Sequence, residues 1–292
     1  MKFKESGLMK VFAVIGDPVA HSKSPRIHNS AIQALGLNAI YTRFHLKKAS
    51  DLQSKIFELG LNGANITVPF KEEALKIADY KDEMALNIGS ANTLLIKGQK
   101  IHAYNTDGIG FLRAIAEFRG IKSTLILGAG GTAKALAFVL AKQGISVSVA
   151  NRSVRRLTNF ANYNTTLYES LEIQPFDLII NTTSAGLKDE LLPCDERLLK
   201  GLLSKAKYAF EVIYGKQTPF LKLAKECQIP CKDGASMLLW QGVFAFELFF
   251  ELCSFENLSK NLTQPNAQNS AHLPTNQTHI LNAMQNALNL AF

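Results

Sequence analysis

Two ionisable residues in the N-terminal half have the types and positions that proton transfer requires. Lys71 follows shortly after Pro69, and Asp107 follows Thr106, each where an apolar run gives way to a segment of helical composition. A lysine at such a junction can be partly removed from water, and an aspartate beside it can hold its ammonium group in place. The pair would suit the oxidation of an alcohol or the reduction of a ketone. Without further motifs, a surface lysine and a helix-capping aspartate are the better interpretation.

Two serines lie in a short polar turn just before Pro25. Ser22 and Ser24 place two hydroxyl donors ahead of a predicted helix, an arrangement that suits the binding of a carboxylate. Helix capping explains either serine alone, and Ser24 is a natural N-cap. His21 and His28 are close in sequence, but no acidic partner completes a hydrolytic triad, so nucleophilic catalysis is rejected here.

Several amide and hydroxyl side chains could contact a ligand that carries many hydroxyl groups. An amide both donates and accepts hydrogen bonds, which suits a hydroxylated ring better than an apolar ligand. Each asparagine could equally satisfy the backbone of a turn. The candidates are Asn65, Thr67, Asn92 and Gln241.

A glycine-rich turn separates the apolar run at 123–127 from an apolar helical segment. Glycines let backbone N–H groups approach a pyrophosphate closely, and the helix N-terminus adds partial positive charge. Ala133 occupies the third glycine position of the dinucleotide-binding fingerprint, where a small residue is permitted. The predicted cofactor loop consists of Gly128, Ala129, Gly130, Gly131, Thr132 and Ala133.

The residues after the next predicted strand indicate which nucleotide binds. An NAD site would place Asp or Glu about twenty residues beyond the glycines. Here the chain has Asn151, Arg152, Ser153, Arg155 and Arg156. Guanidinium groups form charge-assisted bonds to a 2'-phosphate that an acid would repel. The segment therefore predicts NADP, although the arginines could also simply hydrate a helix start.

The elements that must position these residues alternate between strands and helices. In the first half we expect strands at 11–16, 39–46, 64–68, 93–96 and 101–104, and helices at 25–35, 49–59 and 71–78. A helix from 107 to 118 leads to further strands at 123–127, 146–150, 178–181 and 208–213. This alternation predicts the α/β class, with parallel pairing in the first half and a Rossmann-type doubly wound sheet in the second. The strands at 93–96 and 101–104 do not alternate with a helix and are expected to be joined by a turn at Gly98.

The domain boundaries follow from these elements and from the C-terminal composition. We expect a substrate-binding catalytic domain at 1–107, an NADP-binding domain at 108–241, and C-terminal helices at 242–292 that pack on the substrate domain. The strongly apolar segment 237–255 predicts one helix, and the spacing of Ile280, Met284 and Leu288 predicts another over 279–292. The polar segment between them, about 257–278, is predicted to be a linker.

Composition excludes several other classes of protein. The 292 residues are 47% hydrophobic, which fits a globular chain of two domains. The net charge of +8 comes from scattered Lys and Arg residues, and no zinc-finger spacing is present, so neither nucleic acid nor a metal is expected. Without an apolar stretch long enough to span a membrane, we expect a cytoplasmic protein, as a monomer or homodimer. The cysteines are expected to be buried free thiols: Cys194, Cys227, Cys231 and Cys253.

Six blocks of the chain, in order, resemble the shikimate dehydrogenases and span about 11–248. They read GDPVAHSKSPRIHN (16–29), NITVPFK (65–71), GSANT (89–93), NTDG (105–108), NTTS (181–184) and MLLWQG (237–242). The resemblance implies reversible reduction of 3-dehydroshikimate to shikimate with NADPH. It implies that Ser22 and Ser24 bind the carboxylate and that Lys71 and Asp107 form the catalytic pair. It also assigns Tyr214, in a Tyr-x-x-x-x-Thr-Pro segment, to the substrate, and Thr182, Ser184 and Gly234 to the cofactor.

The chain departs from the family pattern at a few points, and other functions stay open. Glu211 stands where the family more often has Asp, a change that we interpret as structural, and the polar segment before the last helix is unusual. The family's first strand lies close to its initiator, so Met9 is an expected start. The alternatives are a quinate/shikimate dehydrogenase that uses NAD, a folate-processing dehydrogenase, and a non-catalytic NADPH-binding sensor.

Overall fold

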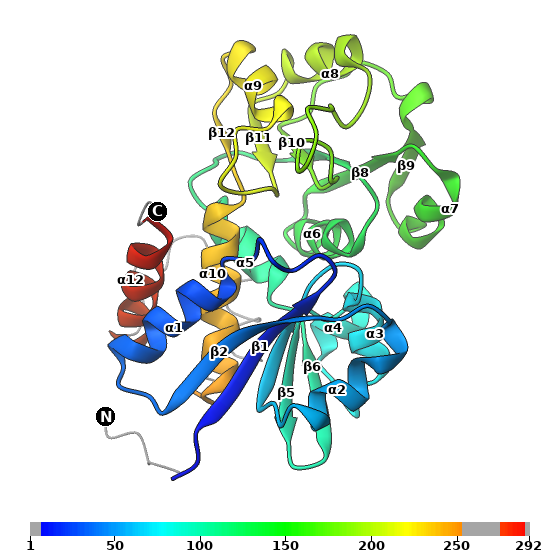
Figure 1. The fold of residues 1–292 in the computed structure, drawn as a ribbon. Coiled ribbons are helices and arrows are strands. Elements are labelled where there is room, and N and C mark those ends of the chain that lie inside the picture. Colours follow the sequence, from blue (N-terminus) through cyan, green and yellow to red (C-terminus); the bar gives the residue numbers. More distant parts are fainter. Residues whose placement is uncertain (1–6, 253–274, 290–292) are drawn as a thin grey trace. The chain divides into compact units, whose positions relative to one another are not determined.

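The described residues form two units. A computed structural model describes residues 7–252 and 275–289 (Figure 1). Within these ranges the first unit contains 7–110, 239–252 and 275–289, and the second contains 111–238. The first unit therefore joins the N-terminal part of the chain to its C-terminal helices.

The first unit is built on a mixed six-stranded sheet in the order β2-β1-β3-β5-β6-β4. Its strands are β1 (Lys10–Gly16), β2 (Ala39–His45), β3 (Gly63–Ile66), β4 (Tyr80–Lys81), β5 (Thr93–Lys97) and β6 (Lys100–Tyr104). β1 pairs in parallel with β2 and β3, and β4 with β6, but β5 is antiparallel to both of its neighbours. A tight turn at Gly98 (φ +62°) joins β5 to β6 as a hairpin, as the turn predicted between these two strands requires.

Helices cover both faces of this sheet. They are α1 (Ser24–Ala34), α2 (Leu52–Glu58), α3 (Lys71–Lys76), α4 (Glu83–Ile88), α5 (Asp107–Ala114), α10 (Ala235–Phe249) and α12 (Thr275–Asn289), with a 3-10 turn η1 (Ala49–Asp51) before α2. Alternate residues of β1 point to opposite faces. Ala13 and Ile15 share a core with residues of α2, α3 and α4, whereas the Phe12 ring stacks on Phe249 of α10, with ring centroids 4.7 Å apart.

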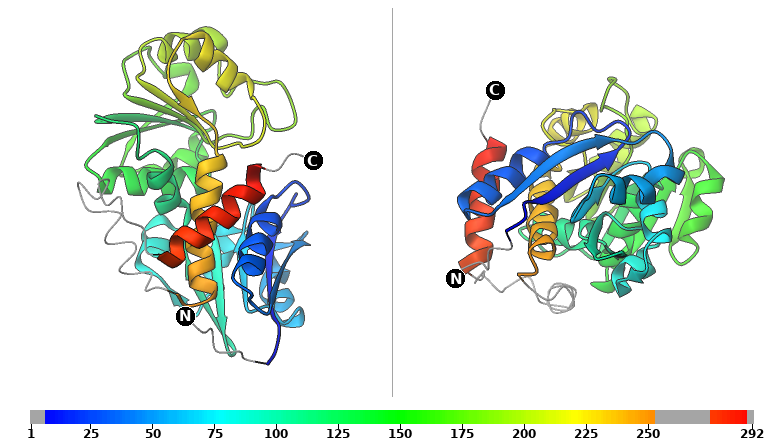
Figure 2. Two further views of the ribbon diagram at one scale, coloured as in Figure 1. Left: turned by 90° about the vertical axis from the view of Figure 1, so that its left-hand side faces the viewer. Right: turned by 60° about the horizontal axis from the view of Figure 1, so that its bottom comes forward.

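The C-terminal helix α12 returns to the N-terminal helix α1. The two lie side by side in both views of Figure 2, and the Ser30 hydroxyl donates to the Ala283 carbonyl at 2.9 Å. Gly242 of α10 lies against Ile27 of α1 and Met284 of α12, so the three helices pack together at this glycine. A Cβ on Gly242 would lie 2.9 Å from Ile27 Cδ1.

The second unit is a parallel six-stranded sheet in the order β12-β11-β10-β7-β8-β9. Its strands are β7 (Ser123–Leu127), β8 (Ser146–Asn151), β9 (Asn164–Leu167), β10 (Leu178–Asn181), β11 (Tyr208–Glu211) and β12 (Cys231–Lys232). Its helices are α6 (Gly131–Lys142), α7 (Val154–Leu157), α8 (Glu196–Leu203) and α9 (Pro219–Glu226), with 3-10 turns η2 (Thr158–Phe160) and η3 (Tyr168–Ser170). The strand order reverses beside β7, which is the switch point of a doubly wound fold. The predicted fold class is confirmed.

Several predicted boundaries of helices and strands were wrong by a few residues. Lys23, not Ser24, is the N-cap of α1, and its side chain makes no capping bond. β3 ends at Ile66 rather than Val68, β11 ends at Glu211 rather than Ile213, and α5 ends at Ala114 rather than Phe118. α12 begins at Thr275, so the last residues of the predicted linker are helical, while 257–274 lie outside the described residues.

Four short elements were not predicted from the sequence: β4, α4, β9 and β12. α4 carried a readable signal, because the Asp82 carboxylate accepts from the N–H groups of Met84 and Ala85 and Gly89 ends the helix in the left-handed region. The strands β4 and β12 have two residues each, too few to show an alternating pattern.

Two further expectations concern thiols and membranes. Cys194, Cys227 and Cys231 are free but only partly buried, so the prediction of buried thiols was wrong for these three, and Cys253 lies outside the described residues. No helix within 7–252 or 275–289 has both the length and the apolar composition needed to cross a membrane.

Candidate functional site

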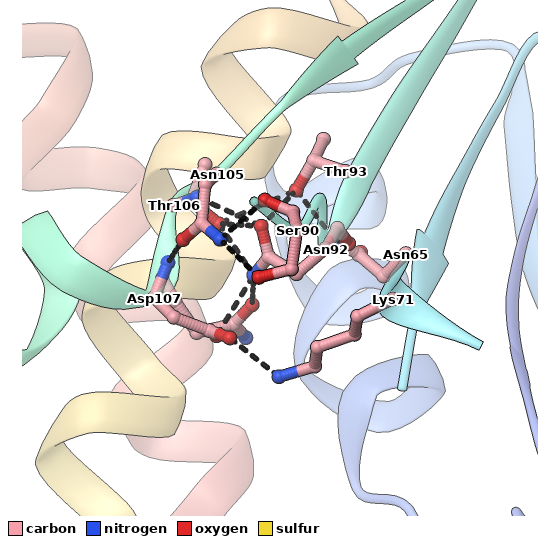
Figure 3. Close-up of polar contacts among 9 residues, drawn as sticks. Asn65, Lys71, Ser90, Asn92, Thr93, Asn105, Thr106 and Asp107 are labelled. Carbon is pink, nitrogen blue, oxygen red and sulfur yellow. Dashed lines mark hydrogen bonds and ion pairs between the residues drawn. The ribbon is translucent and has the colours of Figure 1, made fainter. Parts of the chain in front are cut away.

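Lys71 and Asp107 meet in the first unit. The Lys71 ammonium donates to Asp107 Oδ2 at 2.5 Å, and the two side chains are 12% and 9% exposed (Figure 3). Each residue is the first of a helix, α3 or α5. Partial burial strengthens the attraction between the charges, because little water screens them.

The topology of the sheet explains why these residues gather. β3 and β6 both run antiparallel to β5, which lies between them. The carboxyl ends of β3 and β6 therefore lie at the same edge as the start of β5. Lys71 follows β3, Asn92 precedes β5, and Asp107 follows β6, so one edge of the sheet presents all three.

Asn92 fixes the Asp107 carboxylate. Its amide nitrogen donates to Asp107 Oδ1 at 2.8 Å and to Thr106 Oγ1 at 3.0 Å, and its Oδ1 accepts the Thr106 backbone N–H at 2.7 Å. The Asp107 N–H in turn donates to Asn105 Oδ1 at 3.1 Å. Each carboxylate oxygen of Asp107 thus accepts a hydrogen bond, which a buried charge requires.

Gln241 joins this cluster from α10. The Asn92 amide nitrogen lies 3.4 Å from Gln241 Oε1, and both side chains are buried. Gly110 of α5 makes the approach of α10 possible, because a Cβ at that position would lie 2.8 Å from the Gln241 backbone nitrogen. A side chain on Gly110 would therefore displace Gln241 from Asn92.

Asn65 and Thr67 lie at the end of β3. The Asn65 amide donates to Thr93 Oγ1 at 3.0 Å, and its Oδ1 accepts the Tyr41 hydroxyl at 2.7 Å. The Thr67 side chain is half-buried and packs against Gly16, where a Cβ would collide with the threonine methyl group. Gly16 is therefore needed for Thr67 to face this edge.

The serine turn belongs to the same unit. Ser22 and Ser24 are buried, and Ser22 Oγ accepts the Ser24 backbone N–H at 3.3 Å, which leaves the Ser22 hydroxyl proton for another acceptor. Arg43 of β2 holds the turn from behind, since its Nε and one terminal nitrogen donate to the Ser22 carbonyl at 3.1 and 2.7 Å. A substrate carboxylate would thus meet hydroxyl donors on a turn that the Arg43 guanidinium group holds in place.

The glycine-rich turn of the second unit fits a dinucleotide. Gly128 follows β7 with φ +103°, and a Cβ there would lie 2.7 Å from Thr182 Oγ1. Gly130 is the N-cap of α6, and a Cβ on it would meet nothing within 4 Å, so its backbone borders open space. Ala133 is fully buried in α6. Such a turn lets backbone donors approach a pyrophosphate.

The basic segment after β8 is exposed. Arg152, Arg155 and Arg156 all reach solvent, and the Asn151 amide donates to the Ser153 carbonyl at 3.0 Å, which tightens the turn. No acidic residue occurs between 151 and 160. This edge therefore suits a 2'-phosphate rather than a free ribose hydroxyl pair.

The remaining predicted residues lie on loops of the second unit. The Thr182 hydroxyl donates to the Leu127 carbonyl at 2.8 Å, whereas Ser184 is exposed. Tyr214 is half-buried on the loop after β11. Gly234 supports that loop, because a Cβ on it would collide with the Val212 carbonyl oxygen.

Glu211, the departure from the family pattern, joins the ends of β10 and β11. Its carboxyl group accepts from the Asn181 amide at 2.8 Å, the Thr218 hydroxyl at 3.0 Å and the Ile213 N–H at 3.1 Å. Burial raises the pKa of Glu211 to about 7, against the lowering effect of these donors. The longer glutamate side chain thus fills a structural role between two loops.

Several members of this polar cluster were not predicted from the sequence. Ser90, Asn105, Thr106 and Thr93 lie within blocks that were quoted for the family resemblance, so that resemblance was the available signal. Tyr41 is the one buried residue of β2 (Ala39–His45), a strand of mixed composition, and its sequence context carried no signal of a site.

Known proteins resemble the chain in both sequence and structure. Residues 14–94 match the family model described as shikimate dehydrogenase substrate binding domain. A protein of Helicobacter hepaticus named shikimate dehydrogenase (NADP(+)) is 47% identical over 246 residues, covering 83% of this chain and 91% of the relative. A crystal structure of shikimate dehydrogenase from Aquifex aeolicus matches with TM-score 0.78 at 31% identity, covering 96% and 98% of the two chains. One from Thermus thermophilus, in complex with NADP(H) and shikimate, matches with TM-score 0.76 at 30% identity, covering 96% and 100%.

Proposed function

The chain belongs to the shikimate dehydrogenase family, and we propose that Lys71 and Asp107 are its catalytic pair. The activity is the reversible, NADP-dependent interconversion of shikimate and 3-dehydroshikimate, an oxidation or reduction at a CH–OH group. The observation that carries the assignment of the pair is their contact at 2.5 Å with both side chains largely buried.

Lys71 supplies the proton that this reaction needs. NADPH, when bound, provides the hydride that reduces the ketone. The developing alkoxide oxygen then takes a proton from the Lys71 ammonium, and in the reverse direction the neutral amine accepts the hydroxyl proton. Asp107 holds the Lys71 nitrogen in one direction and offers a carboxylate oxygen to the substrate hydroxyl.

The other polar residues of the first unit would bind the rest of the substrate. Ser22 and Ser24 would donate to the carboxylate, beside the start of α1. The amides would bind the ring hydroxyls, and a hydroxyl that binds Asn65 or Asn92 would replace one of the hydrogen bonds that these amides make within the unit. These residues are Asn65, Asn92 and Gln241, with Thr67 beside them.

The second unit would hold NADP. Gly128, Gly130 and the start of α6 would take the pyrophosphate, and Arg152 with its basic neighbours would take the 2'-phosphate. Tyr214, Thr182, Ser184 and Gly234 are proposed to line the reacting end of the ligands on the strength of the family resemblance alone. The basic segment after β8 disfavours the NAD-dependent quinate alternative, and the intact Lys71–Asp107 pair disfavours a non-catalytic sensor.

A spectrophotometric assay tests the proposal. The purified chain is mixed with shikimate and NADP, and the growth of NADPH absorbance is followed; parallel reactions contain NAD, or quinate in place of shikimate. We expect turnover with shikimate and NADP to exceed every other combination. A chain that binds NADP but turns over neither alcohol would support the sensor instead.

A further inference from the structure

We propose that Tyr41 is a positioning residue of this active site, whose hydroxyl group holds the Asn65 amide in the orientation that substrate binding requires. The inference rests on the proposed function and deepens it. Tyr41 lies on β2, is 2% exposed, and donates to Asn65 Oδ1 at 2.7 Å. It therefore acts from the interior of the unit, behind the residues that would touch the substrate.

The neighbours of Asn65 determine which way its amide faces. Asn65 Nδ2 lies 3.3 Å from the Asn92 backbone carbonyl, which can only accept a hydrogen bond. The nitrogen must face that carbonyl, because the flipped amide would oppose two oxygens. Oδ1 then faces Tyr41, whose phenol must donate. Loss of the phenol proton donor would leave Asn65 Oδ1 without this partner and weaken the preference for one orientation.

A continuous chain of hydrogen bonds connects Tyr41 to the catalytic carboxylate. Asn65 Nδ2 donates to Thr93 Oγ1 at 3.0 Å, Thr93 Oγ1 donates to Asn92 Oδ1 at 3.2 Å, and Asn92 Nδ2 donates to Asp107 Oδ1 at 2.8 Å (Figure 3). Asn65 and Thr93 are also register partners of β3 and β5. A change in the Asn65 amide therefore reaches the group that holds Lys71.

The same phenol also contacts the predicted carboxylate site. A hydrogen bond with the Ser24 side chain lowers the pKa of Tyr41, although burial outweighs it and raises the pKa well above the ordinary value. Tyr41 thus stays a neutral phenol whose single proton goes to Asn65, so Ser24 is the donor in the second hydrogen bond, and its hydroxyl group must turn away from Tyr41 to donate to a substrate carboxylate. One hydroxyl group links the two ends of the proposed substrate site.

Helix α1 holds Tyr41 in place through two consecutive residues. The His28 ring stacks on the Tyr41 ring with centroids 4.2 Å apart and planes at 7°. The Asn29 side chain binds the strand backbone on both sides, accepting the Tyr41 N–H at 2.9 Å and donating to its carbonyl at 2.8 Å. Because both the ring and the backbone of Tyr41 are held, the position of its hydroxyl group beside Asn65 is fixed as well.

Steady-state kinetics of Tyr41→Phe test the proposal, with Tyr80→Phe as the matched control. The Phe variant removes a single oxygen and keeps the stacked ring; Tyr80 is 43% exposed in the same unit and has no place in the site. We expect the KM for shikimate to rise about tenfold in Tyr41→Phe, the size of one lost hydrogen bond in a binding site, with the KM for NADP unchanged. Tyr80→Phe should match the wild-type chain in both constants.

A double-mutant cycle separates positioning from packing. If Tyr41 acts through Asn65, the variant carrying Tyr41→Phe and Asn65→Ala should bind shikimate no more weakly than Asn65→Ala alone. Thr93→Val, which breaks the next bond of the chain while Tyr41 remains, should raise the shikimate KM in the same way and so tests the bonds between Asn65 and Asn92.

Three results would overturn the role of Tyr41: a shikimate KM within twofold of wild type, equal rises in the KM values for shikimate and NADP, or fully additive effects in the cycle. Failure of the proposed function looks different, because the wild-type chain itself would then not oxidise shikimate. In that event the shift in melting temperature caused by shikimate, compared between wild type and Tyr41→Phe, still tests Tyr41 directly.

Discussion

Lys71 Nζ and Asp107 Oδ2 lie 2.5 Å apart although 36 positions of sequence separate the two residues. They meet because α3 and α5 begin beyond strands β3 and β6, whose ends lie at one edge of a sheet with the start of β5 between them. Asn92, at the start of β5, donates to the other carboxylate oxygen of Asp107, so the Lys71 ammonium group and the Asn92 amide bind different oxygens of the same carboxylate.

Replacing Lys71 by alanine should abolish most turnover. In the proposed mechanism the Lys71 ammonium group delivers the proton to the substrate oxygen, and general acid–base catalysis of this kind contributes roughly a hundredfold or more. We expect kcat to fall by about that factor, with only a modest rise in the shikimate KM. Lys76→Ala on the same helix, where the side chain is 77% exposed, is the control and should keep wild-type kinetics. Unchanged kcat in Lys71→Ala would remove the lysine from the chemistry.

The sequence predicted the parts of this site that lie at junctions, but not the network that joins them. The sequence indicates Lys71, Asn92 and Asp107 as site residues because each lies next to the start or the end of a strand or helix. The contact of Asn65 with Thr93 depends on the register of β3 against β5, which is set by pairing between distant segments. Tyr41 was not predicted for a related reason: a tyrosine in a strand cannot be distinguished from a core residue until the partner of its hydroxyl group is known.

The fold, like the site, was predicted only in part. The alternation of strands and helices was enough to predict a doubly wound second half, because parallel strands need helical crossovers. The turn at Gly98 between the strands at 93–96 and 101–104 was also predicted, but the antiparallel pairing of β5 with β3 depends on contacts between distant segments and has no signal in the strand–helix alternation. Short strands such as β4 and β12 depend on the sheet they join rather than on their own residues.

Arg152 should decide the choice between the two nicotinamide nucleotides. Its guanidinium group stands exposed at the end of β8, where a charge-assisted bond to the 2'-phosphate contributes about 1.5–3 kcal/mol, or roughly tenfold to a hundredfold in affinity. Arg152→Ala should raise the KM for NADP by about that factor and leave the KM for NAD nearly unchanged. Arg197→Ala, an exposed arginine on α8, is the control. Equal changes in both Michaelis constants would show that Arg152 does not recognise the phosphate.

Two glycines of the cofactor loop should respond differently to the same substitution. Gly128→Ala should destabilise the second unit, because an alanine would be strained at φ +103° and its Cβ would lie 2.7 Å from Thr182 Oγ1. In Gly130→Ala the added Cβ meets nothing within 4 Å, and the backbone φ of −96° is allowed for alanine, so the melting temperature of this variant should equal that of wild type. Its methyl group should nevertheless raise the KM for NADP several-fold if the pyrophosphate approaches there. Thermal melts and NADP titrations of the two variants check this, and a Gly130→Ala variant with wild-type affinity would place the pyrophosphate elsewhere.

His28 should make the chain sensitive to acid. Burial lowers the pKa of His28 to about 3, whereas in the unfolded chain the imidazole has its ordinary pKa of 6.5. Between these values the unfolded chain binds a proton that the folded chain does not, so the free energy of unfolding falls as the pH drops below about 6.5. The loss attributable to His28 should reach about 2 kcal/mol at pH 5. Glu211, whose pKa burial raises to about 7, acts in the opposite sense.

Denaturant unfolding of His28→Phe and wild type at pH 5 and pH 7.5 isolates this contribution, because Glu211 is common to both chains. Phenylalanine keeps an aromatic ring against Tyr41 but cannot take up a proton, so the variant should lose less stability than wild type between the two pH values, even if the larger ring lowers its stability at both. His21→Gln, which alters an exposed histidine, should keep the wild-type pH dependence. If His28→Phe and wild type lost equal stability on acidification, the buried imidazole would have to accept its proton without unfolding, and the stack on Tyr41 would have to tolerate a charge.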